Sequence, residues 1–173
     1  MATNIEIKAR VQDFAALQAR AEAISDGPVE RISQEDIFFQ TPRGRLKLRI
    51  LNPEHGQLIF YMRPDTAGPK RSDYFISVTN EPDSLKLVLA SSLGVRGIVR
   101  KERWLYWVSH TRIHLDQVED LGAFIELEVM LQAGQQQEQG EQIAAEIMAR
   151  LGVEESNLIE GAYIDLLSPS SID

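Results

Sequence analysis

The chain begins with a stretch in which polar and apolar residues alternate, Asn4-Ile5-Glu6-Ile7-Lys8-Ala9-Arg10. Successive side chains of a β-strand point to opposite faces, so Glu6 and Lys8 share one face and the isoleucines share the other. The same alternation returns in later segments, around Arg49, Lys101 and Glu126. This period of two predicts a chain built mainly from strands that are polar on one face and apolar on the other.

Turn residues and helically spaced apolar residues divide the rest of the chain. Strands are predicted over 4–10, 34–39, 45–51, 58–63, 74–79, 98–109, 111–116 and 124–131, helices over 14–24, 84–93 and 135–151, and a short final element around Tyr163 over 158–167. The strands come mostly as hairpins, which predicts an α+β fold with a largely antiparallel sheet. Eight such strands can close into a barrel with an interior. We expect one domain over residues 1–167 and a flexible C-terminal tail over 168–173.

Composition narrows the classes of protein. The 173 residues include no cysteine, which excludes disulfides, thiolate catalysis and zinc–thiolate sites. No apolar run approaches the roughly 20 residues of a membrane span, and the polar N-terminus contains no apolar signal core, so a cytoplasmic protein is expected. The net charge of −8 disfavours nucleic acid and anionic membranes as partners. An anionic ligand would need a local cationic site.

The charges on the polar strand faces are sorted by sign. One group of strands is cationic and another is anionic. The cations are Arg45, Lys47, Arg49, Lys101 and Arg103, and the anions are Glu126 and Glu128, with Glu6 and Asp116 as candidates to join them. Like charges on neighbouring strands repel, so each group costs stability unless a ligand of opposite sign binds. A phosphate chain would compensate the cations and a divalent metal ion the carboxylates, which together describe a metal–polyphosphate complex.

Each of these signals also has a plain structural interpretation. Alone, Glu126-x-Glu128 is typical of a solvated strand face, and Lys101-x-Arg103 of a protected sheet edge. We interpret them as a site because they occur together. His114 shares the parity of Asp116 and would suit a base, but a structural or exposed histidine is the favoured interpretation. Four further cations are expected on the surface: Arg10, Arg43, Lys70 and Arg71.

The ordered set of charged residues resembles the CYTH proteins, the triphosphate tunnel metalloenzymes. The set consists of Glu6-x-Lys8, Leu48-Arg49, Arg63, Lys101-x-Arg103, Asp116 and Glu126-x-Glu128. It covers nearly the whole chain, and the segment from Lys101 to Glu128 most resembles the class IV adenylate cyclase branch. The resemblance implies an eight-stranded antiparallel β-barrel with helices packed outside and a charged tunnel within.

The resemblance also implies roles for individual residues. A metal ion, Mg²⁺ or Mn²⁺, would be held by Glu6, Asp116, Glu126 and Glu128. The triphosphate would be held by Lys8, Lys47, Arg49, Arg63, Lys101 and Arg103, with Lys8 and Asp116 as the catalytic residues. Arg45 shares the parity of Arg49 and is a further candidate. The opening motif of the family is Glu-x-Glu-x-Lys, and this chain has Asn4 at the first position, which offers a carbonyl oxygen but no charge.

The closest branch implies conversion of ATP to cyclic AMP and pyrophosphate. A triphosphatase would use the same charged residues, with water attacking the terminal phosphorus of inorganic triphosphate, thiamine triphosphate or a nucleoside triphosphate. Two other interpretations are a non-catalytic protein that binds a polyphosphate or nucleotide, and a purely structural module. The branch is often dimeric and exposed aromatic strand edges would allow a homodimer, but the sequence indicates no particular interface.

Overall fold

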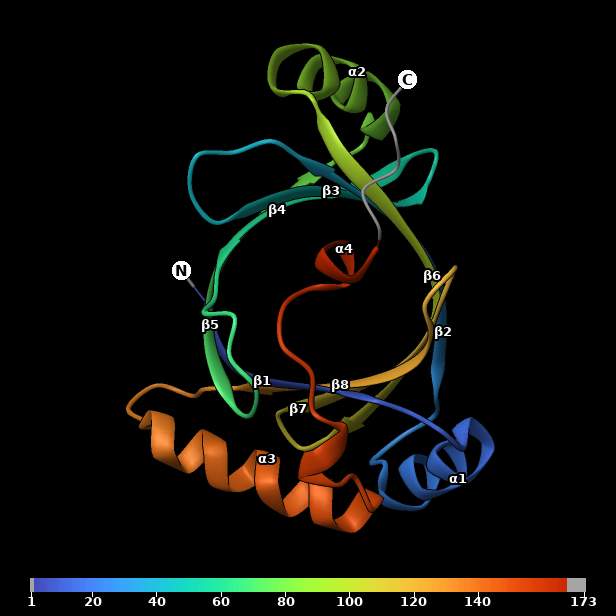
Figure 1. Cartoon of the computed structure of the whole chain (residues 1–173), viewed down its shortest axis with the longest axis vertical. Coiled ribbons are helices and arrows are strands. Elements are labelled where there is room, and N and C mark those ends of the chain that lie inside the picture. Colours follow the sequence, from blue (N-terminus) through green and yellow to red (C-terminus); the bar gives the residue numbers. More distant parts are fainter. Residues whose placement is uncertain (1, 168–173) are drawn as a thin grey trace.

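Eight antiparallel strands form a closed barrel in the computed structural model, which describes residues 2–167 (Figure 1). The order around the barrel is β1-β5-β4-β3-β2-β6-β7-β8, and β8 pairs with β1 to close it. The strands are β1 (Ala2–Arg10), β2 (Glu30–Phe39), β3 (Arg45–Asn52), β4 (His55–Met62), β5 (Lys70–Thr79), β6 (Val95–Val108), β7 (Thr111–Val118) and β8 (Gly122–Met130). The helices are α1 (Phe14–Ile24), α2 (Pro82–Leu93), α3 (Gln137–Leu151), the 3-10 helix Glu155–Asn157 and α4 (Tyr163–Leu166).

The predicted fold class is confirmed, and every predicted strand is present. Six strands begin earlier than predicted, and the largest differences are four residues, for β2 at Glu30 and β5 at Lys70. Their first residues are polar or charged and resemble a loop in the sequence. Pairing with a long neighbour extends them, since Glu30 lies opposite Leu105 of β6 and Lys70 lies opposite Glu6 of β1. The predicted C-terminal tail, 168–173, lies outside the described residues.

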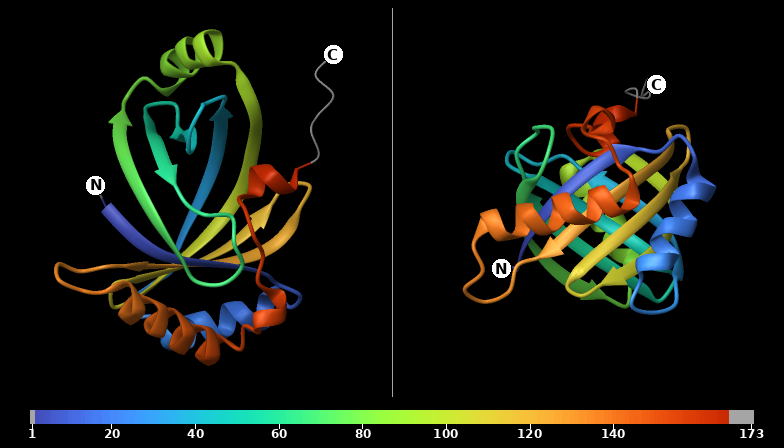
Figure 2. Two further views of the ribbon diagram at one scale, coloured as in Figure 1. Left: turned by 60° about the vertical axis from the view of Figure 1, so that its left-hand side comes forward. Right: turned by 90° about the horizontal axis from the view of Figure 1, so that it is seen from below.

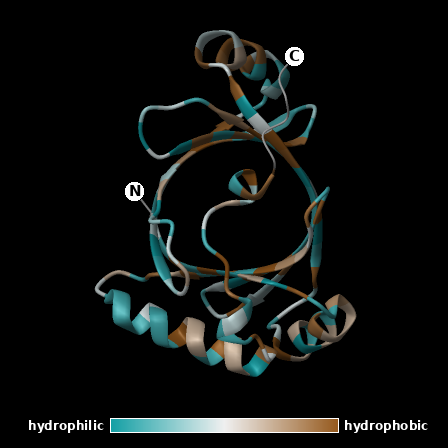
Figure 3. Cartoon of the chain, viewed as in Figure 1, coloured by the Kyte–Doolittle hydropathy of each residue, from teal (hydrophilic) through white to brown (hydrophobic). Residues whose placement is uncertain are grey.

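Two of the three apolar clusters lie outside the barrel wall, between the strands and the helices that Figure 2 shows packed against them. Ile5, Ile7 and Leu127 face outward from β1 and β8 and are fully buried beneath α1 and α3. A second cluster joins Ile37 and Leu48 to α2. The third joins α4 to Phe38, Val99 and Phe124 at one end of the barrel. Because each strand alternates, covering its apolar face on the outside leaves its polar face directed into the barrel. Figure 3 shows the alternation as mixed colours along the strands.

Close packing fixes α3 against the first strand. A methyl group added at Gly140 of α3 would lie 2.6 Å from Cγ1 of Ile5 and 2.7 Å from Cδ2 of Leu131, so only glycine allows this approach. The helix ends at Gly152, whose φ of 67° is in the left-handed region that glycine adopts without strain. This contact holds β1, which carries Glu6 and Lys8 on its other face.

The C-terminal segment crosses one end of the barrel. In Figure 1, α4 lies within the outline of the barrel viewed end-on. Leu158 forms a bridge with Ala9, and Tyr163 packs against Phe124 and lines the barrel cavity. The short final element predicted around Tyr163 is therefore a helix that closes one end of the barrel. Within residues 2–167, no helix combines the length and apolarity needed to cross a membrane.

Candidate functional site

The polar strand faces meet in a single cavity of about 280 Å³ inside the barrel. Nearly all residues predicted for the site line it. These are Glu6, Lys8, Lys47, Arg49, Arg63, Lys101, Arg103, Glu126 and Glu128. Asp116 lies in the wall beneath them and is fully buried. The charges that the sequence places on separate strands thus face one enclosed space, rather than water.

One cationic cluster is organised around Asp36 of β2. Arg49 donates from Nε and Nη2 to the two carboxylate oxygens at 2.7 and 2.8 Å, and Lys47 Nζ donates at 2.8 Å. Lys101 Nζ lies 3.9 Å away. Burial opposes ionisation of Asp36, but Arg49 and Lys47 outweigh it and hold the pKa of Asp36 well below its ordinary value. Asp36 is a site residue that the sequence analysis missed, although it shares a strand face with other inward residues.

A second cluster is organised around Asp116 of β7. Arg103 donates to both carboxylate oxygens, each at 2.7 Å, and the hydroxyl group of Tyr163 donates to Oδ2 at 2.8 Å. Lys101 Nζ lies 3.7 Å from the same oxygen. Burial disfavours the charge of Asp116, yet Arg103 and Lys101 lower its pKa. The carboxylate is thus ionised and occupied by donors, and it fixes the position of Arg103.

Lys101 lies between the two clusters and is buried almost completely. Removal from water and the neighbouring charge of Arg103 lower the pKa of Lys101 to about 7, although Asp116 and Asp36 oppose the shift. Burial also lowers the pKa values of Lys8 and Lys47. At these ammonium groups the effect of burial on the pKa outweighs that of the neighbouring carboxylates, and a bound polyanion would favour their charged form.

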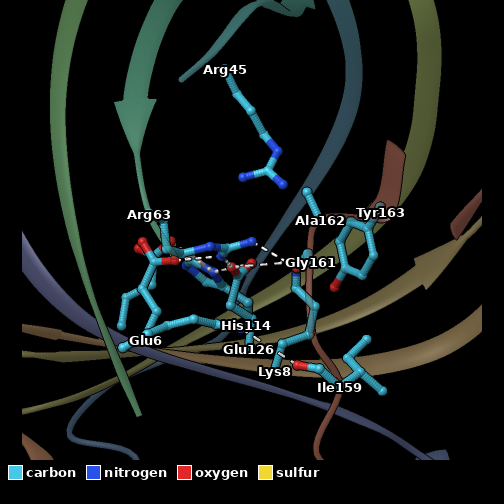
Figure 4. Close-up of polar contacts among 12 residues, drawn as sticks. Glu6, Lys8, Arg45, Arg63, His114, Glu126, Ile159, Gly161, Ala162 and Tyr163 are labelled. Atoms are coloured by element: carbon cyan, nitrogen blue, oxygen red, sulfur yellow. Dashed lines mark hydrogen bonds and ion pairs between the residues drawn. The ribbon is translucent and has the colours of Figure 1, made fainter. Parts of the chain in front are cut away.

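Three carboxylates meet on the adjoining strands. Glu6 of β1 lies directly opposite Glu128 of β8 in the strand register. Glu126, two residues before Glu128, is on the same face of β8. Burial and the charges of Glu128 and Glu126 raise the pKa of Glu6, against the opposing effect of Arg63. Arg63 Nη1 donates to Glu6 at 2.7 Å, and Lys8 Nζ lies 3.7 Å from Glu126 (Figure 4). Such a group of carboxylates is suited to bind a divalent cation.

A histidine completes this acidic group. One donor atom each from His114, Glu126 and Glu128 lie within 4.8 Å of one another, a spacing that would allow a shared metal ion. Neither Glu6 nor Asp116 belongs to this set of three, so their predicted role as metal ligands stays a prediction. His114 is buried rather than exposed, and it faces the carboxylates from β7.

The C-terminal segment contributes contacts that no sequence pattern indicated. Arg63 Nη2 donates to the carbonyl oxygen of Gly161 at 2.7 Å, and the ring of Tyr163 lies 3.9 Å from Lys8 Nζ (Figure 4). Arg45 donates to Asp165 of α4 at 2.8 Å and also to Asp65, so it is engaged at this end of the barrel.

The prediction that Lys70 is exposed was wrong. Lys70 is 2% exposed, and its Nζ donates to the carbonyl oxygens of Thr66 and Ile159 at 2.7 and 3.5 Å. The physical reason is that the loop before β5 and the C-terminal segment cover it. The other three cations predicted on the surface, Arg10, Arg43 and Arg71, are exposed as expected.

Comparison with known proteins agrees with this geometry. The family model of the CYTH domain matches residues 2–163. The chain belongs to the CYTH domain family. A putative adenylate cyclase of Methanocaldococcus jannaschii is 23% identical over 170 residues, which are 94% of this chain and 97% of that protein.

Solved structures of similar fold include two of particular interest. The PH1012 protein of Pyrococcus horikoshii has a TM-score of 0.81 and 25% identity, over 95% of this CYTH chain and 99% of that one. A putative adenylyl cyclase from Hippeastrum, described as having a dominant triphosphatase activity, has a TM-score of 0.63 and 18% identity, over 92% of this chain and 91% of that one. The family and its barrel are thereby established, whereas the specific activity of this chain is a matter for proposal.

Proposed function

We propose that this CYTH protein is a metal-dependent enzyme that binds a triphosphate inside the barrel, and that its reaction converts ATP to cyclic AMP and pyrophosphate. The observation that carries the proposal is the convergence of buried cations and buried carboxylates on one cavity. Clustered like charges in a protein interior are costly unless they serve a ligand. A metal–triphosphate complex compensates both signs at once.

The cations would bind the β- and γ-phosphates. Lys47, Arg49 and Lys101 surround Asp36 and point into the cavity, and arginine and lysine bind phosphate oxygens through charge-assisted hydrogen bonds. Arg103 would join them, held in place by Asp116. Phosphoryl transfer depends mainly on positioning and on stabilisation of charge, which this arrangement supplies.

The carboxylates fit a divalent metal ion. Glu6, Glu126 and Glu128 offer oxygen donors, and the buried Nδ1 of His114 and Oδ1 of Asn4 have no hydrogen-bond partner among the described residues. A bound ion would polarise the α-phosphate and lower the pKa of the attacking hydroxyl group. In the cyclase reaction the 3′-oxygen of ATP would bond to the α-phosphorus. The bond between that phosphorus and the oxygen bridging to the β-phosphate would break and release pyrophosphate, and the 3′-hydroxyl proton would pass to water. Lys8, beside Glu126, would stabilise the charge that develops.

Apolar side chains also line the cavity, and they support a substrate that has an organic group. Ile32, Leu51, Ile76 and Leu105 line the cavity. The strand directions place Ile32, Leu51 and Leu105 at the end away from α4. Apolar side chains contribute little to the binding of inorganic triphosphate, but they would pack against a nucleoside. This favours a nucleoside triphosphate as the substrate.

A nucleoside triphosphatase is the second candidate. It is favoured by the likeness to the Hippeastrum protein, for which triphosphatase activity is described as dominant. Both reactions would use the same cations and carboxylates, so the charged residues do not separate them. The difference lies in whether the 3′-hydroxyl group or a water molecule reaches the phosphorus. A cytoplasmic location and a homodimer stay predictions from the sequence.

Product analysis tests the proposal. The purified protein is incubated with ATP, thiamine triphosphate or inorganic triphosphate, each with Mg²⁺ or Mn²⁺. Cyclic AMP and pyrophosphate from ATP are expected, and Lys101→Ala should abolish them. Orthophosphate without cyclic AMP would replace the cyclase with the triphosphatase. A protein that is stabilised by these ligands but turns none of them over would be a binding protein instead.

A further inference from the structure

His114 is a side chain at the carboxylate end of the cavity that an all-oxygen metal site does not explain. It lies on β7 directly opposite Glu126 of β8, and it is 3% exposed. Within residues 2–167, its buried Nδ1 has no hydrogen-bond partner. A buried polar atom without a partner is unfavourable, so its presence calls for a ligand.

The distances around Nδ1 resemble those of a metal site. Nδ1 lies 3.8 Å from Oε2 of Glu126 and 3.9 Å from Oε1 of Glu128, which is too far for a hydrogen bond. Two atoms that bind one ion at bond lengths near 2.1 Å are separated by at most about 4.2 Å. The three donor atoms are thus spaced for a common ion, with only small side-chain movements needed.

Arginines hold the two carboxylates in this orientation. Arg112 contacts Oε2 of Glu128 at 2.6 Å, which leaves Oε1 of Glu128 facing the imidazole. Arg103 donates at 3.1 Å to Oε2 of Glu126, the same oxygen that faces Nδ1, so a metal ion there would share this oxygen with Arg103 or bind the other oxygen of Glu126. Partners of this kind fix the direction of metal ligands and strengthen binding. Glu128 is therefore held by Arg112 through one oxygen and offers its other oxygen to a metal ion.

We propose that His114 is a metal ligand, and that its imidazole makes the site select a transition metal ion such as Co²⁺ or Zn²⁺ over Mg²⁺. The inference rests on the proposed function, whose metal site it specifies. Imidazole suits such ions, whereas Mg²⁺ takes oxygen donors and dehydrates reluctantly. Asn4 adds to the same preference, because its buried, unpartnered Oδ1 lines this cavity as a neutral donor and brings no charge to attract Mg²⁺.

Calorimetry of the full chain with Co²⁺ and with Mg²⁺ tests the selection. The wild-type protein should bind Co²⁺ at least about tenfold more tightly than Mg²⁺. His114→Phe, which keeps a planar ring but has no nitrogen, should weaken Co²⁺ binding by about 10- to 100-fold and change Mg²⁺ binding by less than about threefold. His110→Phe, in the exposed turn after β6, is the matched control and should bind both ions as the wild type does.

Proton NMR of the Co²⁺-loaded wild-type protein tests the ligand without any mutation. A strongly shifted imidazole N–H signal that disappears in D₂O is expected, with and without inorganic triphosphate. It should persist in His110→Phe. Co²⁺ binding with no such signal would overturn the role of His114 while leaving a metal-dependent enzyme in place. If neither ion binds under either condition, the metal dependence of the proposed function fails together with this inference. Equal affinities for Co²⁺ and Mg²⁺ would overturn the selection.

Discussion

At the scale of single residues, Asn4 is the position at which the proposed metal site departs from the family motif. Asn4 lies two residues before Glu6 on the inward face of β1, at a position where the family motif has glutamate. Its side-chain oxygen is buried and has no hydrogen-bond partner among the described residues. The residue therefore has the location of a ligand without the charge of one. The family fold is retained at this position, and only the electrostatics differ.

We predict that Asn4→Glu tightens the binding of Mn²⁺ by about tenfold, because an added carboxylate raises the charge of the ligand set. Isothermal titration calorimetry measures the change. Gln137→Glu adds the same charge on the exposed face of α3 and should leave the affinity unaltered. An unchanged affinity in Asn4→Glu would mean that position 4 is not close enough to contact the ion.

The lowered pKa of Lys101 predicts how ligand binding depends on pH. Its pKa is lowered from 10.5 to about 7 in the ligand-free barrel, and a polyphosphate beside it would raise that pKa again. Below pH 7 the ammonium group is already charged. Above pH 7 it is neutral, and binding must then take up a proton, so the affinity should fall by up to about tenfold per pH unit.

Calorimetry with inorganic triphosphate between pH 6 and 9, in two buffers of different ionisation enthalpy, would detect this proton uptake. Lys101→Arg keeps the charge over the whole range and should flatten the dependence, leaving the smaller contributions of Lys8 and Lys47. An affinity that rises with pH in the wild-type protein would contradict proton uptake by Lys101.

At the scale of elements, the C-terminal segment matters more than its length indicates. The helix α4 has four residues, yet Tyr163 contacts the most deeply buried carboxylate of the site. Asp165 accepts hydrogen bonds from Arg45 and from the backbone N–H of Ala162, which fixes the helix at the end of the barrel. This segment thus supports the site from one end of the barrel.

Tyr163→Phe should lower the free energy of unfolding by about 1–3 kcal/mol, because Asp116 loses a buried hydrogen bond to an ionised group. Urea denaturation followed by circular dichroism measures it. Tyr106→Phe is the control. Tyr106 is equally buried, but its hydroxyl contacts Glu22 at a weak 3.5 Å, so a smaller effect is expected. Equal effects in the two variants would show that the hydrogen bond to Asp116 adds nothing to the free energy of unfolding beyond that of a weak hydroxyl contact.

At the scale of the whole molecule, the barrel wall separates an apolar layer on its outside from a charged cavity on its inside. Apolar side chains pack between the wall and the helices, and charged side chains face the cavity. The stability of the fold therefore depends on the outer layer. The inner layer carries charges that pair with one another, as Arg49 does with Asp36 and Arg103 with Asp116, around a cavity that can accept a ligand.

Ligands should accordingly stabilise the protein. A triphosphate together with a divalent metal ion at about 100 times its Kd adds about 2.7 kcal/mol and should raise the Tm by roughly 5–10 °C. Lys101→Ala and Glu128→Ala should each abolish this shift, since they remove one cation and one carboxylate of the cavity. A chelator should remove the metal-dependent part. If both variants keep the full shift, the ligand binds elsewhere.

The alternating pattern by itself determined the strands, their two faces and the identity of most cavity residues, because strand geometry has a period of two that is local to each segment. It placed Lys47, Arg49, Lys101 and Glu126 on polar faces without any tertiary information. Closure of the barrel then decided whether those faces meet each other or water. Only a folded chain brings β1 against β8 and Glu6 opposite Glu128.

The contacts that the sequence did not indicate are the ones between distant, irregular segments. Tyr163 reaches Asp116 across 47 residues, Lys70 is covered by the chain around Ile159, and His114 meets Glu128 across a hairpin. No sequence periodicity predicts these contacts. They depend on how the C-terminal segment crosses the barrel and on how the strands are paired. The sequence determined which charges share a face, and the tertiary structure decided which of them share a cavity.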